Sequence, residues 1–379
     1  MRGKKLDIKK GKNGQIDIWL FAIISTLLSI GVVMVYSASS YFSMFESNDS
    51  TVFFKKQAMW AVLGIIAMII TMRIDYHNYR NKRLMYGLYI VTAILLCAVF
   101  LFPATKGAQR WIKLPGGMSF QPSELAKYTV VLFLAYKLTK LGKNIKSLTK
   151  GVIPCLAYAG IIAGIILSQK NLSIASVTMM VSFAMIFIAG ARFKDMFGKI
   201  APLLVLAAVG FTFSSPYRYA RLTNFVDPWK DPAGNGYQLI QSLYALGSGG
   251  ITGLGLGQSR QKTMYMPEPH NDFIFSIIGE ELGLIGCLVI ITLFIAFIWR
   301  GIKIAMEAKD SYGSLIAVGI TSIIGVQCLI NIAVVTGSMP VTGVPLPFIS
   351  YGGSSLVINL AAMGILLNIS RQKQVKIER

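Results

Sequence analysis

The stretch IWLFAIISTLLSIGVVMVY, residues 18–36, decides the class of this protein. It contains no charged residue and is close to the length of about 20 residues that a helix needs to cross a bilayer. Basic residues precede it, but a small-residue cleavage site does not follow it. We therefore expect a retained first membrane helix and not a cleaved signal peptide.

The rest of the chain is also poor in charge. Of its 379 residues, 54% are hydrophobic and 14% are charged, and the mean hydropathy is +0.60. Soluble domains carry about 25% charged residues, so the composition excludes a water-soluble domain and a disordered chain. The cysteines lie in apolar stretches without disulfide or metal spacing, and we expect them to be buried: Cys97, Cys155, Cys287 and Cys328.

Ten apolar stretches predict an all-α, polytopic membrane protein with ten transmembrane helices in a single domain, residues 18–370. The stretches lie near 18–38, 58–72, 84–102, 122–138, 152–168, 172–190, 200–213, 272–298, 312–336 and 352–370. Basic tails, 1–17 and 371–379, flank this domain. A long connection, 214–271, separates the seventh and eighth helices. Its aromatic residues argue against disorder, and we expect a short helix within it at 237–246.

The basic residues set the expected orientation. The chain has 37 Lys and Arg against 16 Asp and Glu, a formal net charge of +21. Alternate connections, counted from the N-terminal tail, hold 25 of the basic residues, whereas the other connections hold 11. The positive-inside rule then places both termini in the cytoplasm and makes 214–271 a large extracytoplasmic loop. Because the charge is explained as an orientation signal, we expect no nucleic-acid partner.

Five charged residues fall within the spans or at their edges: Glu124, Lys127, Asp272, Glu280 and Glu281. A charge in hydrocarbon costs at least about 2.5–3.5 kcal/mol, so each needs a partner or a function. Glu124 and Lys127 are three residues apart, share a helix face and suit an intrahelical ion pair. Glu280 and Glu281 point to different sides of one helix and suit helix packing. We expect one of them to lie near Lys127, because it is the only cation inside a span.

Asp272 opens the eighth span, directly after the string Pro267-Glu268-Pro269-His270-Asn271. One interpretation is a helix N-cap, a position where Asp is favoured. The other is a general base at the outer interface, because desolvation beside the apolar Phe273 should raise the pKa of the carboxyl. The two interpretations do not exclude one another.

Basic residues gather in the outer connections near this acid. They are Lys106 and Arg110 before Trp111, Arg218 and Arg221 after the seventh span, and Arg260 and Lys262 after a glycine-rich run at 247–257. Each alone suits a solvated side chain, but together they suit an anionic substrate such as a pyrophosphate. The two histidines, His77 and His270, fall on opposite sides of the membrane and cannot share a metal. The sequence indicates no cofactor, and a divalent cation stays an open alternative.

Five strings, in this order along the chain, carry a resemblance to a known family. They are Lys106-Gly107-Ala108-Gln109-Arg110-Trp111-Ile112, Gln121-Pro122-Ser123-Glu124, Pro267 to Phe275, Gly279-Glu280-Glu281-Leu282-Gly283, and Pro345 to Ser355. Residues 18–370 resemble the SEDS proteins (shape, elongation, division and sporulation). Phe225-Val226-Asp227-Pro228-Trp229-Lys230-Asp231-Pro232 is most similar to the division type, with the sporulation type close behind.

The resemblance implies a peptidoglycan glycosyltransferase of the cell membrane that polymerises lipid II and releases undecaprenyl diphosphate. The essential aspartate of the family corresponds to Asp272. Substrate contacts with the diphosphate or sugars are expected from Lys106, Arg110, Trp111, Arg218, Arg221, Lys262, Glu268 and His270. The expected partners are a class B penicillin-binding protein, which is a transpeptidase, and other division proteins at the septum.

The chain departs from the family pattern at one place, and three alternative functions stay open. Many relatives have a Pro-Asp-Leu-Gly-Thr-like string where this chain has Lys170-Asn171-Leu172-Ser173-Ile174, so a role of that acid is not transferred. The chain could be a lipid II flippase, which needs a polar path across the whole bilayer. It could also be a sporulation or elongation paralogue. A purely structural division scaffold would not explain an acid in an apolar context.

Overall fold

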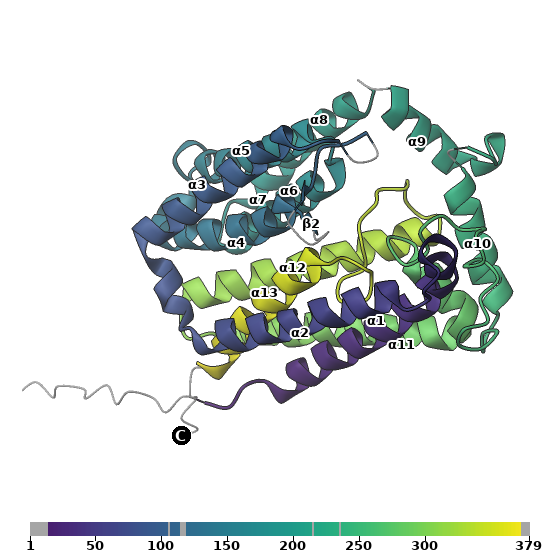
Figure 1. The fold of residues 1–379 in the computed structure, drawn as a ribbon. Coiled ribbons are helices and arrows are strands. Elements are labelled where there is room, and N and C mark those ends of the chain that lie inside the picture. The colour runs from purple at the N-terminus through teal and green to yellow at the C-terminus, as the bar shows by residue number, and fades with distance from the viewer. Residues whose placement is uncertain (1–13, 105–106, 114–118, 214–215, 235, 373–379) are drawn as a thin grey trace, which may run out of the picture.

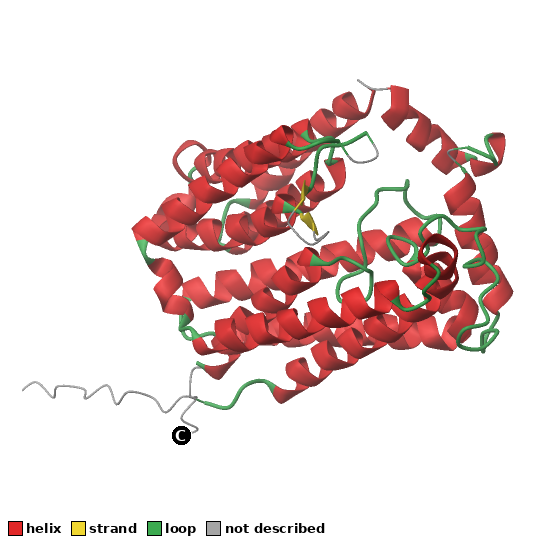
Figure 2. Ribbon diagram, viewed as in Figure 1, coloured by secondary structure: helices red, strands yellow, loops and turns green. Residues whose placement is uncertain are grey.

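The computed structural model describes residues 14–104, 107–113, 119–213, 216–234 and 236–372. These residues form helices joined by loops and one short antiparallel ribbon, in which Ile112 pairs with Phe120 (Figure 2). The all-α prediction is therefore confirmed. The expected basic tails lie largely outside the described residues, which begin at 14 and end at 372.

A helix lies at each of the ten positions where the sequence predicts a span. These helices are α1 (Ile18–Ser47), α2 (Val52–Arg73), α3 (Lys82–Ala98), α4 (Pro122–Leu141), α5 (Ile153–Ser168), α6 (Leu172–Ile188), α8 (Ala201–Phe213), α11 (Ile274–Glu307), α12 (Ser311–Val335) and α13 (Ser354–Arg371). The remaining elements are α7 (Phe193–Asp195), α9 (Pro216–Val226), α10 (Tyr237–Gly249), the ribbon strands β1 (Ile112–Lys113) and β2 (Ser119–Phe120), and the short η1 (Tyr76–Arg80), η2 (Val99–Leu101), η4 (Gly142–Lys146), η5 (Leu148–Val152), η6 (Met196–Ile200) and η7 (Pro228–Lys230).

Seven helical segments among the described residues are long and apolar enough to cross a membrane. They are α1, α2, α3 with η2, η5 with α5, α11, α12 and α13. Of the other three expected spans, α6 is apolar but has 17 residues, α8 has 13 residues, and α4 carries four charged residues. The protein is therefore a membrane protein whose length and composition support at least these seven crossings.

Helix α4 lies at the centre of the bundle, in contact with α3, α5, α6, α12 and α13 (Figure 1). Most of its side chains are buried on every side, as expected for a helix without a polar face. Its first helical residue is Pro122, whose ring suits the first turn. The expectation that all cysteines are buried is wrong for Cys97, which is exposed on the outside of α3; the other three are buried.

The two described chain ends lie side by side at one end of the bundle, where the Gly14 N–H donates to the Arg371 carbonyl at 3.0 Å. Helices α9 and α10 of the long connection lie at the opposite end (Figure 1). The expected short helix at 237–246 is confirmed as α10, which extends to Gly249. Leu239 and Ile240 are buried against the bundle, whereas Tyr244 of the same helix is half exposed.

Helix α11 differs from the sequence prediction because it is broken in its first third. Gly283 has φ 65° and ψ −166°, a conformation that glycine tolerates and other residues rarely adopt. A Cβ at this position would also overlap the backbone nitrogen of Gly253. The glycine-rich run of the long connection therefore packs directly against the break.

Gly283→Ala should lower the midpoint of thermal unfolding by several degrees, because the new methyl group meets both a strained φ and a fixed backbone. Thermal unfolding in detergent, followed by loss of monodisperse protein, measures this shift. Gly160→Ala is the matched control, since a Cβ there meets open space on α5 and alanine favours a helix. Equal stability of the two variants would contradict the break at Gly283.

Candidate active site

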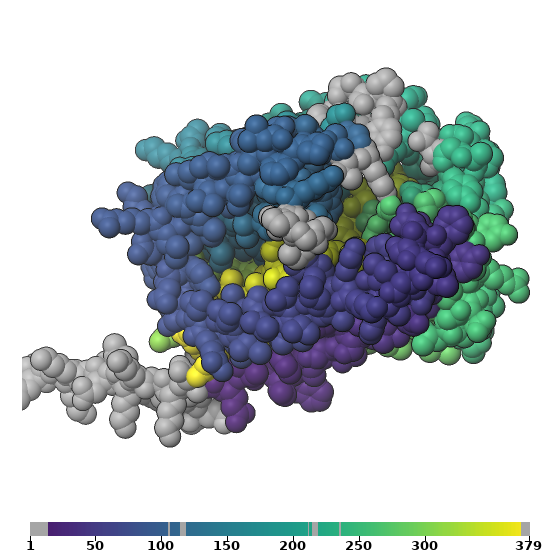
Figure 3. All heavy atoms as spheres, viewed as in Figure 1, coloured from purple at the N-terminus to yellow at the C-terminus, as the bar shows by residue number. Residues whose placement is uncertain are grey.

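A cavity of about 570 Å³ lies where α2, α4 and the loops before α11 and α13 meet. Its lining residues come from two groups of helices that lie apart in the sequence. The space-filling view shows the molecule hollowed between the upper group of helices and α2 below it (Figure 3). They are Lys56, Met59, Trp60, Arg110, Trp111, Ser119, Gln121, Glu124, Asn171, Ile174, Asn271, Asp272, Gly343, Pro345, Tyr351, Gly352, Gly353 and Ser355. This set brings three of the predicted substrate-site residues together: Asp272, Arg110 and Trp111.

Asp272 is half-buried at the cavity and lies just before α11. The helix begins at Ile274 and its N-cap position is occupied by Phe273, so the capping interpretation of Asp272 is wrong. The backbone carbonyl of Asp272 accepts a hydrogen bond from Asn331 Nδ2 at 2.7 Å. The same amide donates to the Val344 carbonyl at 2.7 Å, which ties the acid to the loop after α12.

That loop holds the Asp272 segment at further points. Ser350 Oγ donates to the Asn271 carbonyl at 2.9 Å, and the Tyr351 N–H donates to the His270 carbonyl at 2.9 Å. A Cβ on Gly343, which has φ 75°, would lie 3.1 Å from Asp272 Oδ2. The backbone around the acid is therefore fixed, while its carboxylate borders the cavity.

Two cations line the cavity with Asp272. Arg110 donates to the carbonyls of Gln169 and Lys170, which hold its guanidinium against the turn between α5 and α6. Lys56 is exposed near the N-terminal end of α2, and the sequence analysis missed it. The adjacent basic pair Lys55-Lys56 was the signal that could have identified it. Positive groups opposite a carboxylate suit an anionic substrate.

Tyr351 is a further lining residue that the sequence analysis missed. Burial raises the pKa of its phenol, so the hydroxyl stays protonated at neutral pH. Its ring packs against His270 and Phe53, with centroids 5.6 and 5.2 Å away. The His270 ring packs among aromatic side chains at this wall and is not among the residues that line the cavity.

The buried Glu124–Lys127 ion pair lies beside the cavity, which Glu124 helps to line. Lys127 Nζ lies 2.9 Å from Glu124 Oε2 and donates to Gln327 Oε1 at 3.0 Å, and both charged side chains are almost completely buried. Ser355 Oγ also donates to Glu124, at 2.8 Å. The expectation that Glu280 or Glu281 lies near Lys127 is wrong, because both glutamates bind the loop at 259–262.

Asn171 caps α6 at the place where the chain departs from the family pattern described above. Its Oδ1 accepts a hydrogen bond from the Ile174 N–H at 3.3 Å, and its Nδ2 donates to Ser123 Oγ at 3.5 Å. Ser173 Oγ donates to the Thr342 carbonyl, next to Gly343. The amide therefore retains the capping role without adding a negative charge to the cavity wall.

The other predicted contact residues that the structure describes lie outside the lining of this cavity. Arg221 lines a separate cavity of about 290 Å³ and donates to the Val341 carbonyl at 3.1 Å. Glu268 accepts from Asn271 Nδ2 at 2.9 Å, and Lys262 is buried against Glu281. Lys106 lies outside the described residues, and Arg218 belongs to α9 but its side chain is outside the description. Within the described ranges, no group of three or more His, Cys, Asp or Glu could hold a metal ion.

A half-buried acid held by backbone contacts, with cations across a cavity in a helical membrane bundle, fits the family suggested by the sequence motifs. The family model described as a cell cycle protein, for FtsW, RodA and SpoVE, matches residues 18–375. This chain belongs to that family. The resemblance to the SEDS proteins is thereby confirmed across nearly the whole described chain.

Individual SEDS proteins match along almost their full length. The chain is 46% identical over 359 residues to stage V sporulation protein E of Bacillus subtilis (strain 168), covering 94% of this chain and 97% of that protein. It is 42% identical over 358 residues to a probable peptidoglycan glycosyltransferase FtsW of Geobacter sp. (strain M18), covering 93% and 96%.

A solved structure shares the fold. It is titled "Structural coordination of polymerization and crosslinking by a peptidoglycan synthase complex", and the matching chain has a TM-score of 0.77 and 28% sequence identity. The match covers 94% of this chain and 98% of the solved chain. The SEDS fold therefore extends over the whole helical bundle.

Proposed function

We propose that this SEDS protein is a peptidoglycan glycosyltransferase that polymerises lipid II into β-1,4 glycan strands during cell division and releases undecaprenyl diphosphate. The observation that carries the proposal is the Asp272 carboxylate at a cavity that Arg110 and Lys56 also line. Relatives that carry the name peptidoglycan glycosyltransferase support it. The similarity to a sporulation protein leaves a role in sporulation as the alternative within the same chemistry.

In the proposed reaction, Asp272 accepts the proton from the 4-hydroxyl of the acceptor GlcNAc. The hydroxyl oxygen attacks C1 of the donor MurNAc, and the bond from C1 to the diphosphate oxygen breaks with inversion. Negative charge then develops on the leaving undecaprenyl diphosphate, where Arg110 and Lys56 stabilise it. Trp111 and Trp60 offer apolar surfaces for the sugars or the first prenyl units.

We further propose that all ten expected spans cross the membrane and that both termini are cytoplasmic. The excess of basic residues in alternate connections supports this orientation. Lys137 also supports it, because its Nζ donates to Tyr86 and Tyr158 hydroxyls near the end of α4 opposite Asp272, an arrangement typical of a snorkelling lysine at an interface. Asp272 then faces the cell exterior, together with the large loop at 214–271.

The proposed partner is a class B penicillin-binding protein, which crosslinks the new strands, together with other division proteins at the septum. The similar solved chain comes from a complex that its title describes as coordinating polymerisation and crosslinking. Arg221, Arg218, Lys106, Glu268 and His270 keep their proposed roles in contacts with lipid II outside the main cavity.

A lipid II flippase is the second candidate, and one observation favours it. Buried polar contacts continue along α4 beyond the ion pair, where Tyr128 donates to Asn359 at 2.7 Å and Thr129 contacts Thr92 at 3.0 Å. The hydrogen-bonding groups of these side chains are paired with one another. The cavity at the opposite end, lined by Thr139 and Asp310, shares no described residue with the Asp272 cavity. The geometry therefore favours the enzyme.

Two assays of the purified protein, alone and with its cognate transpeptidase, distinguish the candidates: polymerisation of lipid II in detergent, and movement of lipid II across the bilayer of vesicles. Glycan polymer that is resolved by gel electrophoresis supports the enzyme. Movement of lipid II across vesicles without any polymer would contradict it and favour the flippase.

Arg110→Ala should lower kcat/KM for lipid II by about 10²-fold, because the cavity loses a fixed donor to the developing diphosphate charge. Lys56→Ala should have a smaller effect, since the ammonium is exposed and partly screened by water. Initial polymerisation rates over a range of lipid II concentrations measure both. Lys113→Ala, on the neighbouring ribbon, is the control and should behave as wild type. An unchanged kcat/KM in Arg110→Ala would contradict the diphosphate assignment.

A further inference from the structure

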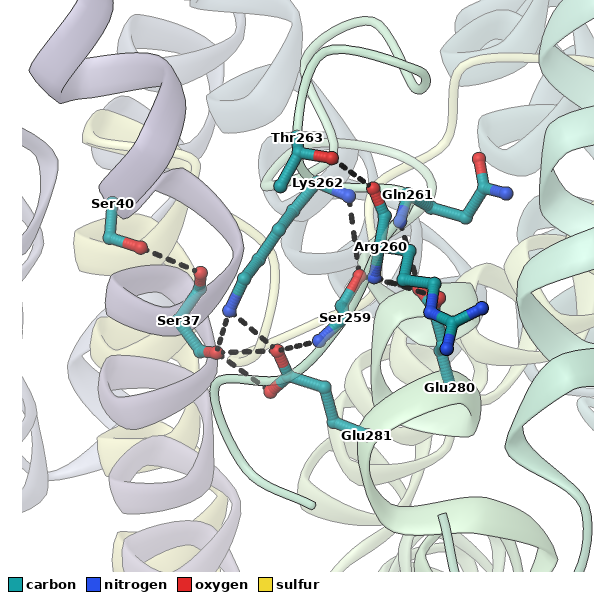
Figure 4. A network of polar contacts seen from close by, with 9 residues as sticks. All are labelled: Ser37, Ser40, Ser259, Arg260, Gln261, Lys262, Thr263, Glu280 and Glu281. Atoms are coloured by element: carbon teal, nitrogen blue, oxygen red, sulfur yellow. Dashed lines mark hydrogen bonds and ion pairs between the residues drawn. The ribbon is translucent and has the colours of Figure 1, made fainter. Parts of the chain in front are cut away.

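A buried polar cluster lies outside the active-site cavity and joins three parts of the chain (Figure 4). We call Ser37, Ser259, Lys262, Glu280 and Glu281 the loop clamp. Lys262 Nζ lies 2.9 Å from Glu281 Oε1, and Ser37 Oγ of α1 donates to both oxygens of Glu281 at 2.8 and 2.7 Å. Lys262 and Glu281 are both buried, so their charges depend on each other.

Glu280 holds the same loop from the adjacent position. It accepts hydrogen bonds from the Arg260 N–H at 2.9 Å, the Gln261 N–H at 3.3 Å and the Ser259 hydroxyl. The Ser259 N–H donates to Glu281 at 3.3 Å. The loop crosses the helix at the break, and both glutamates reach it although they would point apart on a regular helix.

Backbone bonds reinforce this junction. The Leu254 and Gly255 N–H groups donate to the carbonyls of Glu280 and Glu281 at 2.9 and 3.0 Å. On the other side of Gly283, the N–H groups of Leu284 and Ile285 donate to carbonyls of the glycine-rich run, at 2.9 and 3.2 Å. The run supplies the hydrogen bonds that the broken helix lacks, so the junction is a fixed point of the structure.

The clamp closes the segment 263–279, which contains Asp272. Residues 259–262 are bound to Glu280 and Glu281, so both ends of this segment are held at one place. Inside it, the buried Met266 packs against the first turn of α11, where Ser276 Oγ lies 3.5 Å from its sulfur. None of the five clamp residues is among the described residues that line the Asp272 cavity.

We propose that the loop clamp sets the position of the Asp272 carboxylate, with Lys262 and Glu281 as positioning residues. Asp272 is then held from two directions: the loop after α12 fixes its backbone, and the clamp fixes the segment that carries it. Lys262 acts through Glu281 and not by contact with the diphosphate. The inference rests on the proposed catalytic role of Asp272.

Exchange of the two charges tests the proposal. Lys262→Glu and Glu281→Lys should each lower kcat by about 10²-fold, because small displacements of a catalytic group cost that much. KM for lipid II should stay near the wild-type value, since neither residue contacts substrate. The double variant Lys262→Glu/Glu281→Lys restores opposite charges and should recover at least about tenfold in kcat over either single variant.

Direct binding of the diphosphate by Lys262 predicts a different pattern. Lys262→Glu and the double variant would then share a raised KM, and Glu281→Lys would be nearly unaffected; this pattern would overturn the proposal. If the charge-exchanged proteins do not fold, Lys262→Met/Glu281→Gln avoids an unpaired buried charge. A lowered kcat with an unchanged KM in that variant supports positioning, whereas a raised KM or a wild-type kcat overturns it.

Two controls complete the experiment. Asp49→Lys/Lys55→Asp exchanges an exposed ion pair between the α1–α2 connection and the first turn of α2 and should leave kcat and KM unchanged. Asp272→Asn, assayed in parallel, distinguishes a failure of the proposed function from a failure of the proposed clamp. Activity in Asp272→Asn would overturn the proposed function, whereas an inactive Asp272→Asn without recovery in the charge exchange would overturn the clamp alone.

Discussion

Asp272→Asn should lower the rate of glycan polymerisation by about 10³-fold or more, because a positioned general base contributes 10²–10⁴-fold and the amide cannot accept the proton. The protein should remain folded, since the hydrogen bonds from Asn331 and the α12–α13 loop go to backbone atoms that the substitution leaves in place. Polymer formation from lipid II, together with gel filtration of the purified variant, measures both expectations.

Asp49→Asn is a suitable matched control. It changes an exposed acid in the connection between α1 and α2, where hydrogen bonds, chiefly from the Thr51 hydroxyl, hold the pKa of the carboxyl at about 2. The acid is therefore charged at neutral pH, and because it does not line the cavity, loss of its charge should leave the rate unchanged. Wild-type polymerisation by Asp272→Asn would contradict the proposed base, whatever the control shows.

Lys127→Met should severely destabilise the protein, by about 3–5 kcal/mol, because Glu124 is left as an unpaired buried carboxylate. The amount of monodisperse protein and the midpoint of thermal unfolding in detergent should both fall. Glu124→Gln/Lys127→Met removes both charges, so its stability should return close to that of the wild type.

A half-exposed pair should respond less. Lys199→Met breaks an ion pair with Asp195 in which the aspartate is buried but the lysine is mostly exposed, so water can screen the aspartate that remains and the loss of stability should be smaller. If Lys127→Met were as stable as Lys199→Met, the buried pair would not be a structural requirement of the bundle.

The helices could be predicted from the sequence because each depends on a local apolar stretch. Pro122 suits the first turn of α4, and Gly236 and Gly247 flank the stretch that was expected to form α10. The break in α11 could not be predicted in this way. Gly283 alone is compatible with a helix, and the groups that satisfy the broken turn come from residues 250–255, whose packing against it is not a local property of the sequence.

The sequence identified residues of the candidate site only within the strings that resemble the family. Asp272, Arg110 and Trp111 lie in strings that mark the family, and the structure brings them to one cavity. Lys56 lies outside these strings and joins them only because α2 packs at the same place. Tyr351 lies in the Pro345 to Ser355 string, but that string alone did not single it out as a lining residue. Lys262 was assigned to the diphosphate because it is basic and follows glycines, but a buried partner, Glu281, binds it instead.

The most direct test of the central claim is a structure of the Asp272→Asn variant with lipid II bound. We expect the acceptor 4-hydroxyl within hydrogen-bonding distance of the substituted side chain, and the donor diphosphate against Arg110 and Lys56. Lipid II bound at another cavity, or a side chain at position 272 turned away from both sugars, would contradict the account.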